Sequence, residues 1–209
     1  MQTDEAQAAG ERLTQAKRRV RAAIRESRKA RVAEARPAGA LTRHLIDLVT
    51  EHHARRVSCF ASTASEPDTS GFLAWAREHG IETLLPRSLP DGTLEWVLLG
   101  DAPRVTGAFG ISEPVGSPID AGARGVVPLS TCDLIFIPAA AVDHRGTRLG
   151  WGRGFYDRSL IAARSGEPAD RTPVYAVVFE DEVRETLPSE PHDVPVDGAV
   201  TEVQIHHFG

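Results

Sequence analysis

The stretch DLIFIPAAAVDHRGTRLGWGRGFYD, residues 133–157, is the part of the sequence that best indicates the fold. Leu134 to Ile137 form a continuous apolar run, which is typical of a strand covered on both faces. Pro138 is expected to end this strand, because proline has no amide hydrogen to donate to a neighbouring strand. A glycine-rich loop follows, and residues 156–163 are predicted to form a helix. The order strand, glycine loop and helix is typical of α/β proteins that bind phosphate groups.

The loop itself has the chemistry that an anionic ligand requires. Gly150, Gly152 and Gly154 permit positive φ angles and a close approach of the backbone to a ligand. Arg148 and Arg153 add positive charge, and a guanidinium can donate two parallel hydrogen bonds to phosphate oxygens. The spacing matches neither GxxxxGK[ST] nor GxGxxG, so the two common nucleotide loops are excluded. On local features alone, a flexible surface loop followed by a helix-capping aspartate is the alternative.

Length and composition favour one α/β domain over residues 1–209, with the order of residues 1–10 left open. No apolar run approaches the ~20 residues that span a bilayer. The N-terminal segment is polar and lacks the apolar core of a signal peptide. The two cysteines, Cys59 and Cys132, have neither a disulfide pattern nor a zinc-site spacing. A soluble cytosolic protein that does not bind membranes is therefore expected.

The charge is distributed unevenly along the chain. Residues 1–36 contain ten Lys or Arg and five Asp or Glu, which gives +5, whereas the whole chain carries −5. The remainder therefore carries −10. A basic first helix on an acidic body argues against a nucleic-acid-binding protein, which usually has a basic face across its domain. The helix is expected either to be solvated or to reach an anionic ligand.

Helices and strands are predicted to alternate along the chain. The predicted helices are residues 11–35, 42–54, 71–79 and 156–163, and the predicted strands are residues 57–61, 81–85, 94–99, 134–137, 173–179 and 199–203. Residues 100–130 are predicted to form a long loop with little regular structure. Alternation of this kind indicates a mainly parallel sheet with helices on both faces. Ligands of such sheets bind beyond the carboxyl ends of the strands.

Five segments, taken in order, resemble the 5-formyltetrahydrofolate cyclo-ligase family, also called methenyltetrahydrofolate synthetases. The segments are AKRRVRAAIR (16–25), SEPDT (65–69), FGISEP (109–114), DLIFIPAAAVD with RLGWGRGFYD (133–157), and HDVPVDGAVTE (192–202). They extend over nearly the whole chain. A single glycine loop is a weak signal, but five segments in the family's order are a specific one.

The resemblance implies a Rossmann-like three-layer α/β/α fold around a mixed, mainly parallel sheet. It also implies that ATP and 5-formyltetrahydrofolate, with Mg²⁺, are converted to 5,10-methenyltetrahydrofolate, ADP and phosphate. The formyl oxygen attacks the γ-phosphate, the second folate nitrogen closes the ring, and phosphate leaves. No protein nucleophile is needed, so positioning and charge neutralisation are expected to supply the catalysis. No nucleic acid, membrane or obligate protein partner is indicated.

The ATP-binding residues implied by the resemblance lie on the first helix and in the glycine loop. Lys17 and Arg21 match the family's basic pair, and their i, i+4 spacing places both on one face of a helix. Arg18, Arg25 and Arg28 are interpreted as solvated residues. Arg148 and Arg153 are expected to stabilise phosphate charge. The loop residues matched to ATP binding are Arg148, Gly150, Trp151, Gly152, Arg153, Gly154, Phe155 and Tyr156.

The resemblance also assigns a folate site and a magnesium site. The folate-binding residues are Glu66, which is matched to a pterin-binding glutamate, Phe109, Trp151, Arg153 and Phe155. Ordinary core packing is the alternative for Trp151 and Tyr156.

Asp157 and Asp193 match magnesium ligands, although helix capping also accounts for Asp157. Asp143 is interpreted as a residue that orders the loop, and it ranks below these two as a metal ligand. Ser88 stands where some members have tyrosine, which puts one folate contact in doubt.

Three other functions were weighed. A paralogue that binds folate or nucleotide without turnover would not need the carboxylates at Asp157 and Asp193. An unrelated phosphate-binding enzyme, such as a sugar-phosphate isomerase, leaves the SEPDT and HDVPVD segments unexplained. A nucleic-acid-binding protein fits least, because the body is acidic and aromatic residues do not alternate with basic ones.

Overall fold

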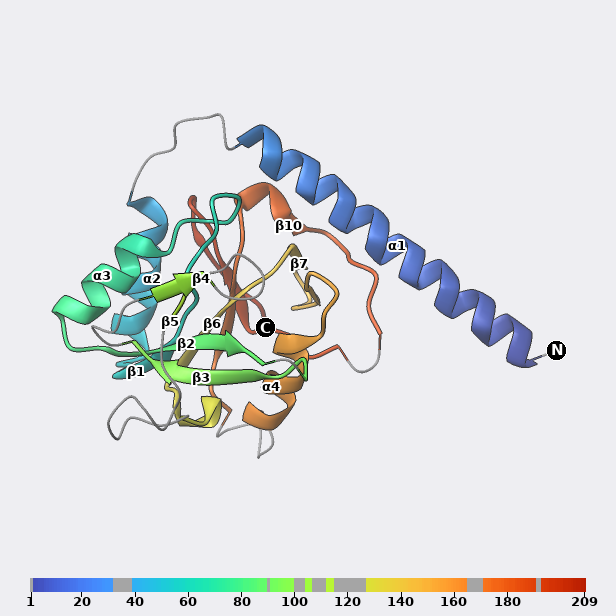
Figure 1. Cartoon of the computed structure of the whole chain (residues 1–209). Coiled ribbons are helices and arrows are strands. Elements are labelled where there is room, and N and C mark those ends of the chain that lie inside the picture. The colour runs from blue at the N-terminus through green and yellow to red at the C-terminus, as the bar shows by residue number, and fades with distance from the viewer. Residues whose placement is uncertain are drawn as a thin grey trace.

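A seven-stranded sheet runs through the middle of the protein (Figure 1). The computed structural model describes residues 2–31, 39–89, 91–99, 104–106, 112–114, 127–164, 171–190 and 193–209. The strands of the sheet are β1 (Arg56–Ser58), β2 (Glu82–Ser88), β3 (Leu94–Leu98), β6 (Leu134–Pro138), β9 (Val174–Val177), β11 (Gly198–Val200) and β12 (Ile205–His207). Their order is β12-β11-β9-β6-β1-β2-β3. The five inner strands are parallel, and the two edge strands β3 and β12 are antiparallel to their neighbours.

Helices cover both faces of this sheet. The helices are α1 (Gln2–Arg31), α2 (Ala40–Glu51), α3 (Ser70–Glu78) and α4 (Phe155–Ala163). The central strand β6 shows how the layers are divided, because its side chains alternate between faces. Leu134 and Phe136 belong to the core beneath α2 and α3, whereas Ile135 and Ile137 pack with Leu160 of α4. An apolar run without polar interruptions is what a strand buried on both faces requires.

The first helix lies against a second, smaller sheet. This sheet has the order β10-β7-β8 and consists of β7 (Ala141–Asp143), β8 (Arg148–Leu149) and β10 (Val183–Arg184). Ile24 of α1 is buried in a small core with Ala140, Ala141, Leu149 and Leu187. The N-terminal end of α1 projects beyond the body of the protein (Figure 1). The remaining elements are the antiparallel pair β4 (Arg104–Thr106) and β5 (Ser112–Pro114), and the 3₁₀ helices η1 (Leu129–Thr131) and η3 (Glu180–Glu182).

The predicted class, a mainly parallel sheet with helices on both faces, is confirmed. Several boundaries were wrong. Helix α1 begins at Gln2, so the segment whose order was left open is helical from residue 2 onward. The strand predicted over residues 57–61 ends at Ser58. The predicted loop over residues 100–130 contains the β4–β5 pair, and β7, β8, β10 and β12 were not predicted. None of the described helices is long and apolar enough to cross a membrane.

The sheet has a topological switch point between β1 and β6. From β1 the chain moves through α3 to β2 on one side, and from β6 it moves through α4 to β9 on the other. The loops that follow these two neighbouring strands therefore diverge at their carboxyl ends. A crevice for ligands is expected at this place in an open α/β sheet.

Candidate functional site

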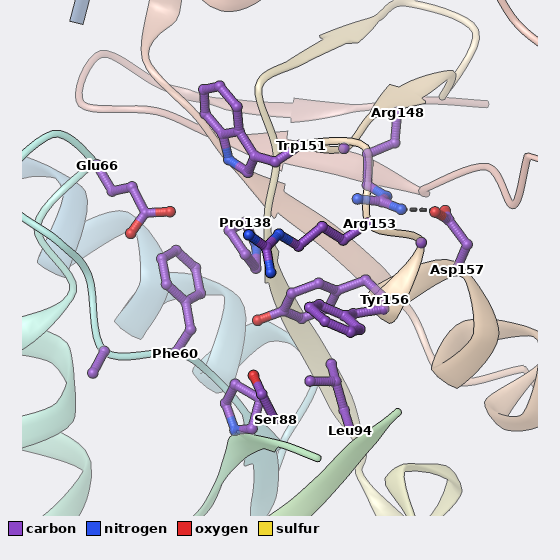
Figure 2. Close-up of a pocket in the computed structure, with 15 residues that line it drawn as sticks. Phe60, Glu66, Ser88, Leu94, Pro138, Arg148, Trp151, Arg153, Tyr156 and Asp157 are labelled. Carbon is purple, nitrogen blue, oxygen red and sulfur yellow. Dashed lines mark hydrogen bonds and ion pairs between the residues drawn. The ribbon is translucent and has the colours of Figure 1, made fainter. Parts of the chain in front are cut away.

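A cavity of about 250 Å³ lies at this switch point (Figure 2). Its wall is built from the segment after β1, the end of β2, the start of β3, the end of β6, and the chain from β8 into the first turn of α4. The lining residues are Phe60, Ala61, Glu66, Pro86, Ser88, Leu94, Pro138, Arg148, Gly150, Trp151, Arg153, Gly154, Phe155, Tyr156 and Asp157. The glycine loop between β8 and α4 therefore forms part of the cavity wall.

One part of the cavity is apolar and aromatic. Phe60, Pro138 and Tyr156 face the space from three different segments (Figure 2). Burial raises the pKa of Tyr156 far above its usual range, because the phenolate would be poorly solvated there. The Tyr156 ring also packs edge-on to Trp96, with ring centroids 6.0 Å apart. This part can therefore hold a flat, largely apolar ring system, next to a hydroxyl that stays protonated.

Glycine is required at two points of the loop. Gly152 has φ +96° and Gly154 has φ +68°, and residues other than glycine rarely adopt such positive φ angles. A Cβ atom at Gly150 would lie 2.9 Å from Arg148 Nη1, and one at Gly152 would lie 3.4 Å from Arg21 Cζ. The glycines therefore let two guanidinium groups approach the loop backbone. They also leave the loop's amides accessible to an anion at the start of α4.

Arg148 and Asp157 form an ion pair at the rim of the cavity (Figure 2). The side chain of Arg148 is only 2% exposed, whereas that of Asp157 is 31% exposed. Arg148 Nε is buried and has no hydrogen-bond partner among the described residues. A buried guanidinium donor without a partner, at the edge of a cavity, is a favourable place for a phosphate or carboxylate oxygen.

Lys17 of α1 is held by two carboxylates from the C-terminal part of the chain. Its Nζ lies 2.7 Å from Glu190 Oε2 and 2.7 Å from Asp193 Oδ2. Burial alone would lower the pKa of Lys17, but the hydrogen bonds to Asp193 and Glu190 outweigh it and raise the pKa. The lysine is therefore charged at neutral pH, and its two hydrogen bonds fix the position of its ammonium group.

Arg21 connects α1 to the glycine loop. Its Nε donates a hydrogen bond of 2.7 Å to the carbonyl oxygen of Gly150. Burial, and then the neighbouring Arg25, lower the pKa of Arg21, while the charges of Asp193 and Asp157 act in the opposite direction. Asp157 and Asp193, the two carboxylates predicted to bind a metal ion, are thus close enough to Arg21 to influence its pKa. The structure brings Lys17, Arg21, Arg148, the glycine loop, Asp157 and Asp193 into one region.

The carboxylates fit a magnesium ion that arrives with phosphate better than a preformed metal cage. Among the described residues, no group of three or more His, Cys, Asp and Glu side chains is arranged to hold a metal ion. Asp157 and Asp193 are each paired with a cation, Arg148 and Lys17. Mg²⁺ usually takes one or two carboxylates and completes its coordination with water and phosphate oxygens. The donor set is therefore suitable for a phosphate-bound magnesium ion.

The predicted folate residues also line the cavity, with one outside the described residues. Trp151, Arg153, Phe155 and Glu66 all face it. Glu66 Oε2 accepts a hydrogen bond of 2.8 Å from the Thr63 amide, which ties this carboxylate to its loop. Phe109 lies outside the residues that the structure describes.

Two further observations concern the residues around Glu66. Ser88, for which the sequence left one folate contact in doubt, lines the cavity as well. Glu66 and Trp151 also line a second cavity of about 360 Å³, which has Arg25, Arg28, Lys29, Thr63 and Ser65 as its other walls.

Some residues were misread or missed. Arg28, interpreted as solvated, is buried and paired with Glu182. Phe60 and Glu190 were not singled out, because neither belongs to a recognisable motif. Asp143 does order its loop, since its carboxylate accepts hydrogen bonds from the amides of Arg145, Thr147 and Leu187.

Comparison with known proteins identifies relatives of this chain. Residues 13–202 match the model of the 5-formyltetrahydrofolate cyclo-ligase family. A 5-formyltetrahydrofolate cyclo-ligase of Mycolicibacterium smegmatis is 36% identical over 152 residues, covering 70% of this chain and 73% of that protein. The mouse 5-formyltetrahydrofolate cyclo-ligase is 28% identical and covers 91% of this chain and 95% of its own.

The fold also matches that of a solved relative. The solution structure of 5,10-methenyltetrahydrofolate synthetase from Aquifex aeolicus has a TM-score of 0.70 at 24% identity, covering 92% of both chains. The family match extends over nearly the whole chain, from the first helix that holds Lys17 to the segment after β11. The chain therefore belongs to the 5-formyltetrahydrofolate cyclo-ligase family of enzymes.

Proposed function

We propose that this protein converts 5-formyltetrahydrofolate and ATP, with Mg²⁺, to 5,10-methenyltetrahydrofolate, ADP and phosphate. The observation that carries the proposal is the composition of the main cavity. Its aromatic part, with Phe60 and Tyr156, continues directly into the glycine loop and its guanidinium groups. A folate ring and a triphosphate can thus lie next to each other, as a reaction between the two requires.

The nucleotide phosphates bind at the glycine loop and α1. Lys17 and Arg21 approach the loop from α1, and Arg148 approaches it from β8. The Nε of Arg148, which has no hydrogen-bond partner within the described part of the chain, supplies a donor together with the loop amides, and Arg153 adds a further charge at the cavity. Preorganised donors of this kind stabilise charge that develops on a transferring phosphoryl group.

Asp157 and Asp193 hold the magnesium ion in this proposal. Each would exchange its present cation, Arg148 or Lys17, for an ion that accompanies the triphosphate. The bound ion supplies neutralisation of phosphate charge. The displaced guanidinium and ammonium groups remain close by and are free to bind phosphate oxygens.

The folate binds in the aromatic part of the cavity. Glu66 is suited to accept paired N–H bonds from the pterin, and Trp151, Arg153 and Phe155 surround the reacting edge. Because burial raises its pKa, the Tyr156 hydroxyl stays neutral and can donate a hydrogen bond to the bound ring system.

The chemistry proceeds in two steps. The formyl oxygen forms a bond to the γ-phosphorus while the bond to ADP breaks, which converts a poor leaving group into phosphate. The second folate nitrogen then attacks the formyl carbon, loses its proton, and phosphate departs as the ring closes. All bonds form between the substrates, so the protein contributes positioning and charge stabilisation.

The test is the absorbance of the methenyl product when purified protein is mixed with 5-formyltetrahydrofolate and Mg²⁺, with and without ATP. An ATP-dependent increase, with one ADP formed for each methenyl group, is the expected result. Folate binding without any increase would favour a non-catalytic paralogue. Absence of both binding and turnover would show that another substrate has replaced the folate.

A further inference from the structure

Arg28 is the most deeply buried cation of α1. It forms a two-pronged ion pair with Glu182 of η3, with Nε to Oε1 and Nη2 to Oε2 both 2.8 Å. The two side chains are 2% and 0% exposed. A buried charge pair needs such geometry, because desolvation of both ions must be offset by hydrogen bonds. The pair is therefore a fixed part of the structure and not a surface contact.

The pair joins α1 to the carboxyl ends of two neighbouring strands. Arg28 Nη2 also donates a hydrogen bond of 2.8 Å to the carbonyl oxygen of Ala139, directly after β6. Glu182 Oε2 accepts a hydrogen bond of 2.9 Å from the amide of Phe179, just after β9. The first helix is thereby fixed to both segments that lead away from the sheet behind the site.

The guanidinium of Arg28 also contacts the glycine loop through an aromatic ring. Its Cζ lies 4.9 Å from the centroid of the Trp151 ring and 5.3 Å from that of Phe179. Its Nη1 has no hydrogen-bond partner among the described residues, so the ring faces supply part of its surroundings. A desolvated guanidinium over an indole is a favourable cation–π contact. Arg25 lies 5.5 Å from the same ring but is exposed, so water weakens its contact.

Arg28 does not line the main cavity itself, but it contacts Trp151, which does. Arg21 already holds the preceding residue, Gly150, by its carbonyl oxygen. Helix α1 thus holds the loop at two successive residues, one by its backbone and the next by its side chain.

We propose that Arg28, held by Glu182, is a positioning residue that fixes the Trp151 indole as a wall of the main cavity and so sets the affinity for the substrate bound there. The identity of that substrate as 5-formyltetrahydrofolate rests on the proposed function. The effect is expected on the folate side, because the proposed phosphate ligands are Lys17, Arg21 and Arg148, none of which depends on the Trp151 ring.

The test is a double-mutant cycle between Arg28 and Trp151. Arg28→Lys keeps a charge that can pair with Glu182 but removes the planar group that stacks on the indole and forks onto the carboxylate. With Trp151 present, the KM for folate is expected to rise about tenfold, with kcat and the KM for ATP nearly unchanged. In a Trp151→Leu background, the same substitution is expected to change the folate KM less than about twofold.

Arg31→Lys is the matched control. Arg31 contacts the same Glu182, 3.2 Å from Nη1 to Oε1, and its Cζ lies 4.7 Å from the Phe179 ring centroid. Within the described residues Arg31 does not contact Trp151, so the folate KM of Arg31→Lys should stay unchanged. An equal rise in Arg31→Lys, or an equal effect of Arg28→Lys in both backgrounds, would overturn the proposal, because the effect would then be a general loosening of α1.

Two additions keep the test decisive. If Arg28→Lys does not fold, Arg28→Met combined with Glu182→Leu removes both buried charges and should show the same dependence on Trp151. Arg31 loses its contact with Glu182 in this variant but keeps its ion pair with Asp181. Calorimetric binding of 5-formyltetrahydrofolate without ATP gives the same comparison without turnover. An inactive wild type that binds folate with this dependence refutes the proposed reaction but supports the role of Arg28. Absence of folate binding refutes both.

Discussion

Lys17 Nζ lies 2.7 Å from Asp193 Oδ2, although the two residues are 176 positions apart in the sequence. A second carboxylate, Glu190, lies at the same distance from the same nitrogen. Two carboxylates around one ammonium leave the group with a net negative charge, which a magnesium ion would balance. Lys17, which is predicted to bind the nucleotide, and Asp193, which is predicted to bind the metal ion, are thus paired with each other.

Replacing Lys17 by methionine should raise the KM for ATP about tenfold or more, since the substitution removes a phosphate-binding charge and leaves two carboxylates facing the phosphates. The folate KM should change little. The measurement is initial rate against ATP concentration at saturating folate. Lys29→Met is the control, because Lys29 is on the same helix, 71% exposed and paired with Glu26. Equal changes in both variants would contradict the assignment.

The raised pKa of Lys17 gives a pH dependence with a definite sign. Its ordinary value is 10.5, and the folded value is higher. The stabilisation that the ion pairs provide is therefore fully present below pH 10.5 and is lost as pH rises through the folded pKa. Thermal unfolding of the wild type and Lys17→Met between pH 7 and 11.5 checks this. The difference between their melting temperatures should be constant up to about pH 10 and shrink only above it.

Asp157→Ala should abolish magnesium-dependent turnover and leave the fold intact. It should also cost about 2 kcal/mol of stability, because Arg148 is buried and loses its ion-pair partner. Methenyl absorbance and circular dichroism on the same sample test both statements. Glu82→Ala is a suitable control, since it breaks an ion pair with Arg56 that lies away from the cavity. Near-normal turnover in Asp157→Ala would refute its role as a magnesium ligand.

Comparing Gly152→Ala with Gly80→Ala distinguishes the effect of backbone strain from an effect on ligand binding. At φ +96° an alanine is strained, and its Cβ would lie 3.4 Å from Arg21 Cζ. Gly80→Ala is matched to it, because Gly80 has φ +70° but nothing within 4 Å of the added Cβ. Both should lose about 1–2 kcal/mol of stability. Only Gly152→Ala should also raise the KM for ATP, and a similar rise in Gly80→Ala would assign the effect to strain alone.

The two cysteines should be inert in the native protein. Burial raises the pKa of both Cys59 and Cys132 to about 12, so almost no thiolate exists at pH 8. Intact mass after treatment with iodoacetamide should show no addition to the folded protein and two additions in denaturant. Rapid modification of the native protein would show that one of the thiols is accessible.

The fold was predictable where the signal is local. The run from Leu134 to Ile137 has apolar side chains at every position, and such a strand must lie between two layers. The glycine loop and the i, i+4 pair Lys17 and Arg21 are also local patterns, and the structure brings them together. The residues predicted to bind the nucleotide therefore lie in one region of the structure, and their role stays a prediction.

The second sheet could not be predicted, for a physical reason. Its strands β8 and β10 are two residues long, too short for an alternating pattern, and β10 pairs with β7 from a distant part of the chain. The burial of Arg28 was also unpredictable, because it too depends on a distant part of the chain. It depends on Glu182, 154 positions away, and a single arginine in a basic helix gives no local sign of such a partner.

The joining of Lys17 to Asp193 has a consequence for the order in which the protein is made. Lys17 leaves the ribosome early, and its partner Asp193 leaves 176 residues later. Until then α1 lacks the contacts with Asp193, Glu190 and Glu182 that hold it in place. A nascent chain can therefore form its early strands long before these ion pairs fix α1 against the body of the protein.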